Sequence, residues 1–255
     1  MENKLILVEK ANNIAKITFN NGSLNILTIS MMEQINEALD GFIGDQLLKA
    51  LIIDHNGKAF SAGVDVGDHM GDNASKMLKE FHGMFKRLNK IKCPTIASVK
   101  GAALGGGCEV AMFCDIVLTS DKAKFGQPEI KVGVFPPLAV LILPRLIGYK
   151  KAFELIMQGE IIDANEAHRI GLSNYVFSQD SYEEEFNNFI ERFNQLSSVV
   201  LHYSKKAFDL GLGFDFDTQI DEIEEFYLKE LMSTHDANEG LKAFFEKRSP
   251  EWQNR

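Results

Sequence analysis

The chain has little cysteine, and its three cysteines, Cys93, Cys108 and Cys114, form no CxxC pair. An odd count without paired spacing predicts no disulfide framework and favours reduced, buried thiols in a cytoplasmic protein. The six histidines show no metal-ligand spacing either, so the sequence predicts no metal site.

Basic residues and long apolar runs are also lacking. Lys and Arg total 27 against 36 Asp and Glu, which gives a net charge of −9. This balance argues against nucleic acid or an anionic membrane surface as the main partner. No stretch approaches the length of a membrane span, and the N-terminal apolar run is too short for a signal peptide. With 255 residues, 45% of them hydrophobic, the chain can bury one large domain, with or without an appendage.

Two phosphate-binding signatures are absent from the glycine-rich segment Gly101–Val110 (GAALGGGCEV). No Lys followed by Ser or Thr comes after Gly105–Gly107, and the segment holds no GxGxxG fingerprint. What the glycines do allow is a close approach of the backbone to a ligand at the start of a helix, where N–H groups have no intrahelical partner. Such N–H groups can stabilise a developing oxyanion, and the turn Ser61–Val64 could supply another.

Two glutamates lie in apolar or glycine-rich surroundings. Glu109 follows the glycines, and Glu129 lies in Lys124–Ile130 (KFGQPEI). Two carboxyls facing one site tend to split their pKa values, so that one holds a proton while the other stays ionised. Either residue alone could be a buried carboxylate capped by backbone amides. The two together, with the glycines, indicate an acid–base pair that removes one proton and delivers another.

Two neighbouring side chains offer alternative chemistry. Cys108 adjoins Glu109, but adjacent helical residues point about 100° apart and no histidine is near in sequence, which disfavours a thiol nucleophile. His69 follows the segment Asp65–Asp68 and is a candidate for a role in the pocket, beside the simpler interpretation as a packing residue.

Hydrophobic periodicity predicts strand, strand and helix in succession over the first two-thirds of the chain, and helices after about residue 145. Ser30 with Glu33 predicts a capping box at the start of the first helix. The expected strands are Leu5–Glu9, Ile14–Phe19, Leu47–Asp54, Pro94–Val99 and Ile116–Thr119, together with the segment Ala59–Val66, which runs from strand into loop. The expected helices are 29–42, 76–90, 105–113, Tyr149–Gln158, Ala164–Ile170, Tyr182–Leu196, Val199–Leu210, Phe216–Met232 and His235–Lys247. An apolar stripe on the late helices needs a partner surface: Ile220, Ile223, Tyr227 and Leu231.

Five ordered segments together resemble the crotonase (enoyl-CoA hydratase/isomerase) superfamily. They are Lys58–Asp65, Gly101–Glu109, Phe125–Glu129, Ala167–Leu172 and Glu239–Arg248. The resemblance covers nearly the whole chain and implies an α/β fold, a crotonase-like spiral of repeated β-β-α turns with a C-terminal helical trimerisation region. It divides the chain into a catalytic core, 1–195, and a helical region, 196–255. It also implies a homotrimer or homohexamer, an acyl-CoA thioester substrate, and no cofactor beyond the coenzyme A of that substrate.

The same resemblance assigns site residues. It places the oxyanion-hole N–H groups on Val64 and Gly106 and the acid–base pair on Glu109 and Glu129. It also implies a coenzyme A and substrate surface made of Ala62, Val64, Asp65, Val66, Gly67, Phe135, Pro136 and Lys247. The last of these would meet the coenzyme A phosphates, in its own subunit or in a neighbour, unless it is simply a surface lysine.

The chain departs from many family members after Gly133, where Phe135–Val140 (FPPLAV) replaces a Pro-Gly-x-Gly-Gly stretch. Prolines restrict φ, so the segment predicts a rigid wall beside Glu129. This stretch resembles the cyclohexa-1,5-diene-1-carbonyl-CoA hydratases. We therefore expect a hydratase that adds water to a 2-enoyl-CoA or a cyclic dienoyl-CoA. Alternatives are a double-bond isomerase, which needs one glutamate, and a non-catalytic acyl-CoA-binding or RNA-binding relative.

Overall fold

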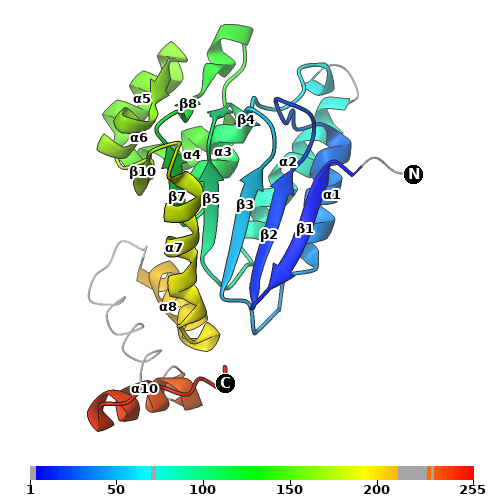
Figure 1. Cartoon of the computed structure of the whole chain (residues 1–255). Coiled ribbons are helices and arrows are strands. Elements are labelled where there is room, and N and C mark those ends of the chain that lie inside the picture. Colours follow the sequence, from blue (N-terminus) through cyan, green and yellow to red (C-terminus); the bar gives the residue numbers. More distant parts are fainter. Residues whose placement is uncertain (1–3, 70–72, 212–228, 231–232) are drawn as a thin grey trace.

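The computed structural model describes residues 4–69, 73–211, 229–230 and 233–255. Over these residues the protein is a mixed α/β structure with two sheets (Figure 1). The larger sheet has the order β1 (Ile6–Ala11), β2 (Ile14–Phe19), β3 (Ala50–His55), β5 (Thr95–Val99), β7 (Ile116–Ser120) and β10 (Tyr175–Phe177). The smaller has the order β4 (Ala59–Ser61), β6 (Ala102–Leu104), β8 (Lys124–Gly126) and β9 (Ile161–Asp163).

A strand-strand-helix unit repeats along the chain. In β3-β4-α2, β5-β6-α3 and β7-β8-α4 the first strand joins the larger sheet and the second joins the smaller one. Strands β3, β5 and β7 run parallel to one another, as do β4, β6 and β8. The returning helices are α2 (Asn73–Leu88), α3 (Gly106–Phe113) and α4 (Pro137–Ile147). This repetition confirms the predicted spiral, and it places the starts of successive helices beside the smaller sheet.

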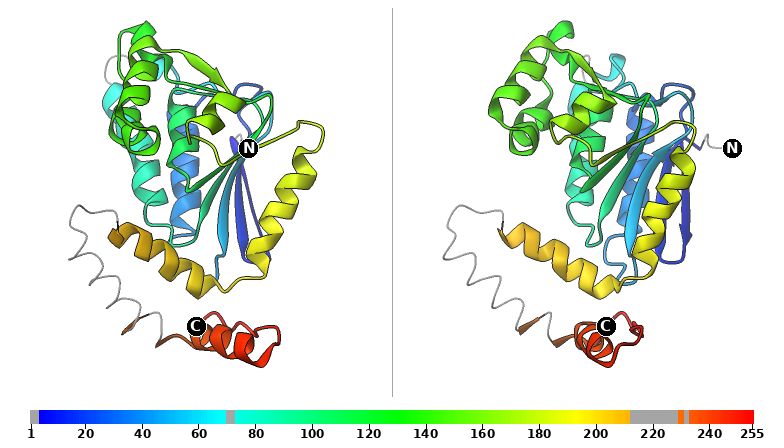
Figure 2. Two further views of the ribbon diagram at one scale, coloured as in Figure 1. Left: turned by 90° about the vertical axis from the view of Figure 1, so that its left-hand side faces the viewer. Right: turned by 60° about the vertical axis from the view of Figure 1, so that its left-hand side comes forward.

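The larger sheet is covered on both faces (Figure 2). Because side chains alternate along a strand, Ile52 and Ile96 pack against α7 (Tyr182–Asn194), while Leu51 and Ile53 belong to the core under α1 (Ile29–Asp40) and α2. Burial on both faces explains why these central strands read as continuous apolar runs in the sequence.

Local details differ from the sequence predictions. The N-cap of α1 is Thr28, whose hydroxyl accepts a hydrogen bond from the Met31 N–H at 3.3 Å, so the capping box predicted at Ser30 is wrong. Helix α4 is absent from the sequence predictions, in which Phe135–Val140 forms a rigid wall beside Glu129. Proline at the first helical position is favourable, since its missing N–H would have no intrahelical acceptor there.

The C-terminal part leaves the sheets at their lower end in Figure 1. Helices α5 (Tyr149–Gln158) and α6 (Ala164–Arg169) lie at the upper left of Figure 1, near β8 and β10, whereas α8 (Ser198–Gly211) crosses the lower end and α10 (His235–Glu246) lies beyond α8. The indole N–H of Trp252 donates to the Gln195 carbonyl at 2.7 Å and ties the C-terminus to the end of α7. Apart from 229–230, the predicted helix Phe216–Met232 lies outside the described residues, and so does every residue of its apolar stripe. Within the described part of the chain, no helix has the length and apolarity that crossing a membrane requires.

Candidate active site

The start of α3 presents an N–H group with no intrahelical partner. Gly106 is the first residue of this helix, so its N–H points away from the helical hydrogen-bond ladder. A Cβ on Gly106 would lie only 2.7 Å from Cγ2 of Val64, which shows how closely the two residues approach.

Val64 presents the second N–H group, because of how its strand segment pairs. The Leu27 N–H donates to the Gly63 carbonyl at 2.9 Å, and the Asp65 N–H donates to the Leu27 carbonyl at 3.1 Å. In a parallel bridge of this kind, the N–H of the central residue, Val64, faces away from Leu27. Within the described residues, neither the Val64 nor the Gly106 backbone N–H donates to another backbone group. The geometry therefore leaves two neighbouring donors available.

Glu109 is buried one turn into α3, with a side chain that is 2% exposed. Its Oε1 accepts hydrogen bonds from the Leu138 N–H at 2.9 Å and the Ala139 N–H at 2.8 Å. Burial raises the pKa of Glu109 to about 7; the negative charge of Glu129 adds to this rise, and the two N–H donors oppose it. A carboxyl with a pKa near 7 can exchange a proton at neutral pH, as general acid–base catalysis requires.

Glu129 lies on the short helix η2 (Pro128–Val132), and its side chain extends to the start of α3. Its Oε1 lies 2.6 Å from the position that a Cβ on Gly105 would occupy, so the carboxylate rests against the glycine turn before α3. When the Gln127 amide is turned with its nitrogen toward this carboxylate, it donates to both oxygens at 3.2 and 3.3 Å. The structure therefore brings Glu109 and Glu129 together at the start of α3, as predicted from sequence.

The other residues predicted to contact coenzyme A or the substrate differ in their exposure to solvent. Val66 is 66% exposed and Phe135 62% exposed, while Pro136 is buried and Ala62 half-buried. The side chain of Asp65 accepts from the N–H of the exposed residue Gly67 at 2.8 Å, which shapes this turn locally.

His69 and Lys247 were each candidates for a role in the binding site, and the structure places them differently. His69 ends the short helix η1 (Gly67–His69), but its side chain lies outside what the structure describes. Lys247 is exposed just after α10, at the opposite end of the chain's fold from α3 (Figure 1). A single chain therefore does not bring Lys247 to the two glutamates.

Burial argues against Cys108 as a thiol nucleophile. Its side chain is 2% exposed, and burial raises the pKa of its thiol to about 12, so a thiolate nucleophile is disfavoured. All three cysteines are free and buried, as predicted. Among the described residues, no cluster of three or more His, Cys, Asp or Glu could hold a metal ion.

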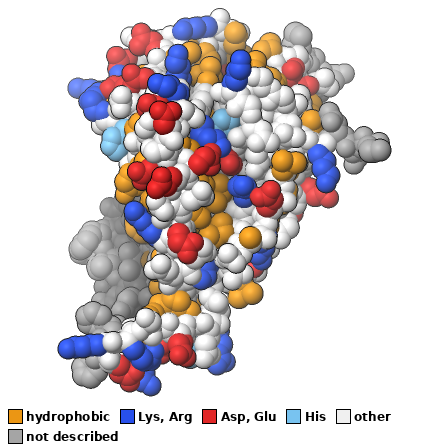
Figure 3. Space-filling model, viewed as in Figure 1, with side chains coloured by type: hydrophobic (Ala, Val, Ile, Leu, Met, Phe, Trp, Pro, Cys, Tyr) orange, Lys and Arg blue, Asp and Glu red, His pale blue; other side chains and the backbone are white. Residues whose placement is uncertain are grey.

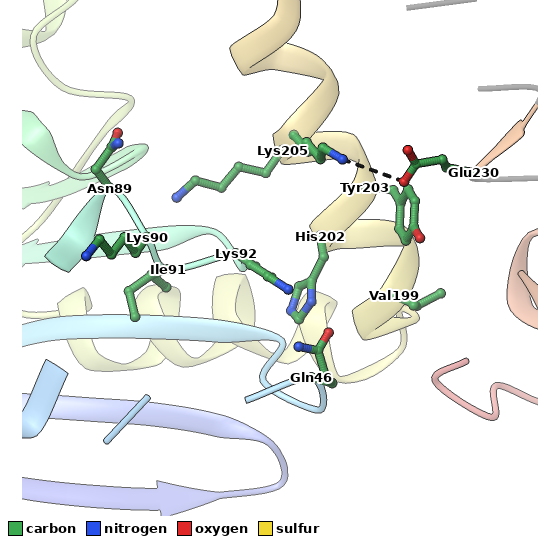
Figure 4. Close-up of a pocket in the computed structure, with 11 residues that line it drawn as sticks. Gln46, Asn89, Lys90, Ile91, Lys92, Val199, His202, Tyr203, Lys205 and Glu230 are labelled. Carbon is green, nitrogen blue, oxygen red and sulfur yellow. Dashed lines mark ion pairs between the residues drawn. The ribbon is translucent and has the colours of Figure 1, made fainter. Parts of the chain in front are cut away.

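A separate cavity of about 360 Å³ lies between α8 and the segment Asn89–Lys92, at the amino end of β5 (Figure 4). Lys205 and Lys206 line it, and Lys206 pairs with Glu230 at 3.6 Å. None of the predicted site residues lines this cavity, because β5 and β6 carry the chain to the other end of the sheet before α3 begins.

Sequence reasoning missed two contributors to the site: the start of α4, which binds Glu109, and Gln127, which adjoins Glu129. The Pro136-Pro137 pair was the available signal for α4, because proline favours the first position of a helix. No comparable signal marks Gln127, whose role depends on the turn into η2.

Two available N–H groups beside a pair of carboxyls are the groups that acid–base chemistry with stabilisation of negative charge on a substrate oxygen requires. Comparison with known proteins gives the family. The family model described as enoyl-CoA hydratase/isomerase matches residues 9–255, and the chain belongs to that family. It is accordingly an enzyme of the hydratase type.

Individual relatives agree over the full length. The chain is 36% identical to a cyclohexa-1,5-dienecarbonyl-CoA hydratase of Thauera aromatica, covering 98% of this chain and 96% of that protein. It is 34% identical to a short-chain-enoyl-CoA hydratase of Clostridium acetobutylicum, covering 98% of each. The crystal structure of an enoyl-CoA hydratase from Mycobacterium smegmatis matches with a TM-score of 0.92 at 26% identity, covering 98% of this chain and 99% of that one.

Proposed function

We propose that this enzyme adds water reversibly across the activated double bond of a 2-enoyl-CoA or a cyclic dienoyl-CoA thioester. The observation that carries the proposal is the pair Glu109 and Glu129 beside the N–H groups of Gly106 and Val64. A hydration needs one proton removed from water and one delivered to carbon, which two carboxyls can do together.

In the proposed reaction the thioester carbonyl accepts hydrogen bonds from the Val64 and Gly106 N–H groups. Glu109 takes a proton from water as the water oxygen bonds to the β-carbon, and electron density moves to the thioester oxygen. Glu129, protonated in the resting complex, then delivers its proton to the α-carbon, which restores the carbonyl. Removing one such oxyanion donor typically raises the barrier by about 3–4 kcal/mol, so the two N–H groups carry a large share of the rate.

Loss of the enoyl-thioester absorbance on adding enzyme, together with the product mass, tests this proposal. Hydration adds one water to the mass, whereas isomerisation leaves it unchanged. No change in either quantity with straight or cyclic substrates would instead favour a non-catalytic acyl-CoA binder.

The surface supports a small-molecule substrate more than RNA. On the face shown in Figure 3, acidic and basic side chains are interspersed over the described part. With the net charge of −9, this supports an enzyme without a nucleic-acid partner, and we propose that it works in the cytoplasm. We propose that coenzyme A enters as part of the substrate and that no further cofactor is needed.

The residues just before α4, Phe135 and Pro136, form the wall that we expect to limit the size of the acyl group. Pro136 is buried at the N-cap of α4, and Phe135 precedes it. The N–H groups that bind Glu109 follow directly, on Leu138 and Ala139. We expect short or cyclic enoyl-CoA substrates to exceed a ten-carbon straight chain in kcat/KM by about tenfold or more. Competition kinetics measure this ratio, and Phe135→Ala should reduce it. Equal turnover of the long chain would show that the wall does not restrict the site.

The division into a core, 1–195, and a helical region, 196–255, fits an assembly in which the second part serves a neighbouring subunit. Large apolar side chains are exposed on α4 and α5, including Leu141 at 58%, Tyr149 at 68% and Phe153 at 50%. Apolar surface gathered in this way commonly marks a protein interface. We expect a homotrimer or homohexamer by light scattering at micromolar concentration, with Lys247 near a neighbour's coenzyme A phosphates. A monomer would contradict this proposal.

A further inference from the structure

The start of α4 lies against the buried carboxyl of Glu109. Leu138 and Ala139 are the second and third residues of this helix, so their N–H groups have no intrahelical acceptor. Both donate to the same oxygen, Oε1, at 2.9 and 2.8 Å. The positive end of the helix therefore faces a carboxylate that is 2% exposed.

The two donors come from a backbone with little freedom. Pro137 occupies the first helical position and Pro136 the N-cap, so φ is restricted at both. Pro137 also lacks an N–H, so the first donors of this helix are those of Leu138 and Ala139. Because both bind Oε1, the other oxygen of Glu109, Oε2, receives neither of these hydrogen bonds.

We propose that the first turn of α4 is the positioning element of the catalytic base: Leu138 and Ala139 hold Oε1 of Glu109 and leave Oε2 to take the proton from water. The proposal rests on the function proposed above and adds to it which backbone groups fix the base. Leu138 and Ala139 act through Glu109 and are positioning residues, whereas Glu109 is the catalytic residue.

The charges around Glu109 explain why the base needs this support. Burial favours the protonated form of Glu109, and so does Glu129 whenever it is ionised, while the Leu138 and Ala139 N–H groups favour the carboxylate. Cys108 faces the same region with a neutral thiol. Without the α4 donors, Glu109 would keep its proton to higher pH and would be a weaker base at neutral pH.

An amide-to-ester exchange tests this with no change of side chain. Ala139→lactic acid replaces the donating N–H by an ester oxygen. We expect the acid limb of the kcat/KM profile to move up by about one pH unit, since a hydrogen bond to a charged group is being removed. At neutral pH kcat should fall about tenfold and recover at higher pH, while KM for the CoA ester changes little.

Ala152→lactic acid is the matched control. Ala152 is also a fully buried helical alanine, and its N–H donates to the Gly148 carbonyl at 3.1 Å at the start of α5. This variant should keep the wild-type pH profile. An unchanged acid limb in the Ala139 variant, or a loss of kcat equal at every pH, would overturn the proposal.

A second readout separates this proposal from the proposed function. Carbon-13 NMR of labelled glutamate, with the Glu109 signal identified through Glu109→Gln, follows the carboxyl titration without any turnover. An upward shift of the Glu109 pKa in the Ala139 variant supports the positioning role, and no shift overturns it. Wild-type enzyme that adds no water to any enoyl-CoA would instead refute the proposed function.

Discussion

Glu109→Gln and Glu129→Gln should each lower kcat by roughly 10²–10⁴-fold, the usual contribution of general acid–base catalysis. Glutamine keeps the shape of the side chain but neither accepts the proton from water nor delivers one to carbon. Hydration kinetics measure the loss, and titration with a CoA ester should show that binding survives.

The double variant is the sharper part of this prediction. Because the two carboxyls act in one proton-transfer sequence, its loss should be much smaller than the product of the single losses. The matched control is Glu154→Gln on the exposed face of α5, where the carboxylate pairs with Lys151 at 3.0 Å. Near-wild-type hydration by either catalytic variant would remove that residue from the assignment.

Gly105→Ala should lower kcat about 100-fold, since a displacement of about 1 Å in a catalytic group can cost this much. The new Cβ would lie 2.6 Å from Oε1 of Glu129, so the carboxylate must move. The change also adds strain, because Gly105 has a φ of +51°. Steady-state kinetics and thermal unfolding, measured together, distinguish a displaced acid from a general loss of stability.

Gly44→Ala is the control for the strain alone. Gly44 has a φ of +87°, and a Cβ there would meet no heavy atom within 4 Å. We expect it to lower the unfolding temperature by a similar amount while kcat stays at the wild-type value. Equal losses of kcat in the two variants would mean that Glu129 is not held against Gly105.

Much of the fold follows from local pattern. The five longer strands and most helices were predicted because apolar side chains recur with clear periods, and Tyr149–Gln158 was placed with the observed bounds. In the smaller sheet the strand at Ala59 was predicted, whereas the three-residue strands β6, β8 and β9 were not. Elements so short have no measurable period and form only because neighbouring turns of the spiral pair with them.

Some residues of the candidate site could also be predicted from the sequence, and others could not. Glu109, Glu129 and the glycines stand out in sequence because a carboxylate among apolar residues and a close backbone approach both need a reason. The α4 donors could not be found from their own residue types, since Leu138 and Ala139 act through the backbone. The proposed role of Lys247 requires a particular arrangement of subunits, which a single sequence does not specify.

The most direct test of the account is the product formed from a short 2-enoyl-CoA in isotopically labelled water. We predict that the wild-type enzyme yields a 3-hydroxyacyl-CoA containing one labelled oxygen, and that the double variant of Glu109 and Glu129 forms it at a strongly reduced rate. A product with the substrate's own mass, or labelled product formed equally fast by the double variant, would contradict the account.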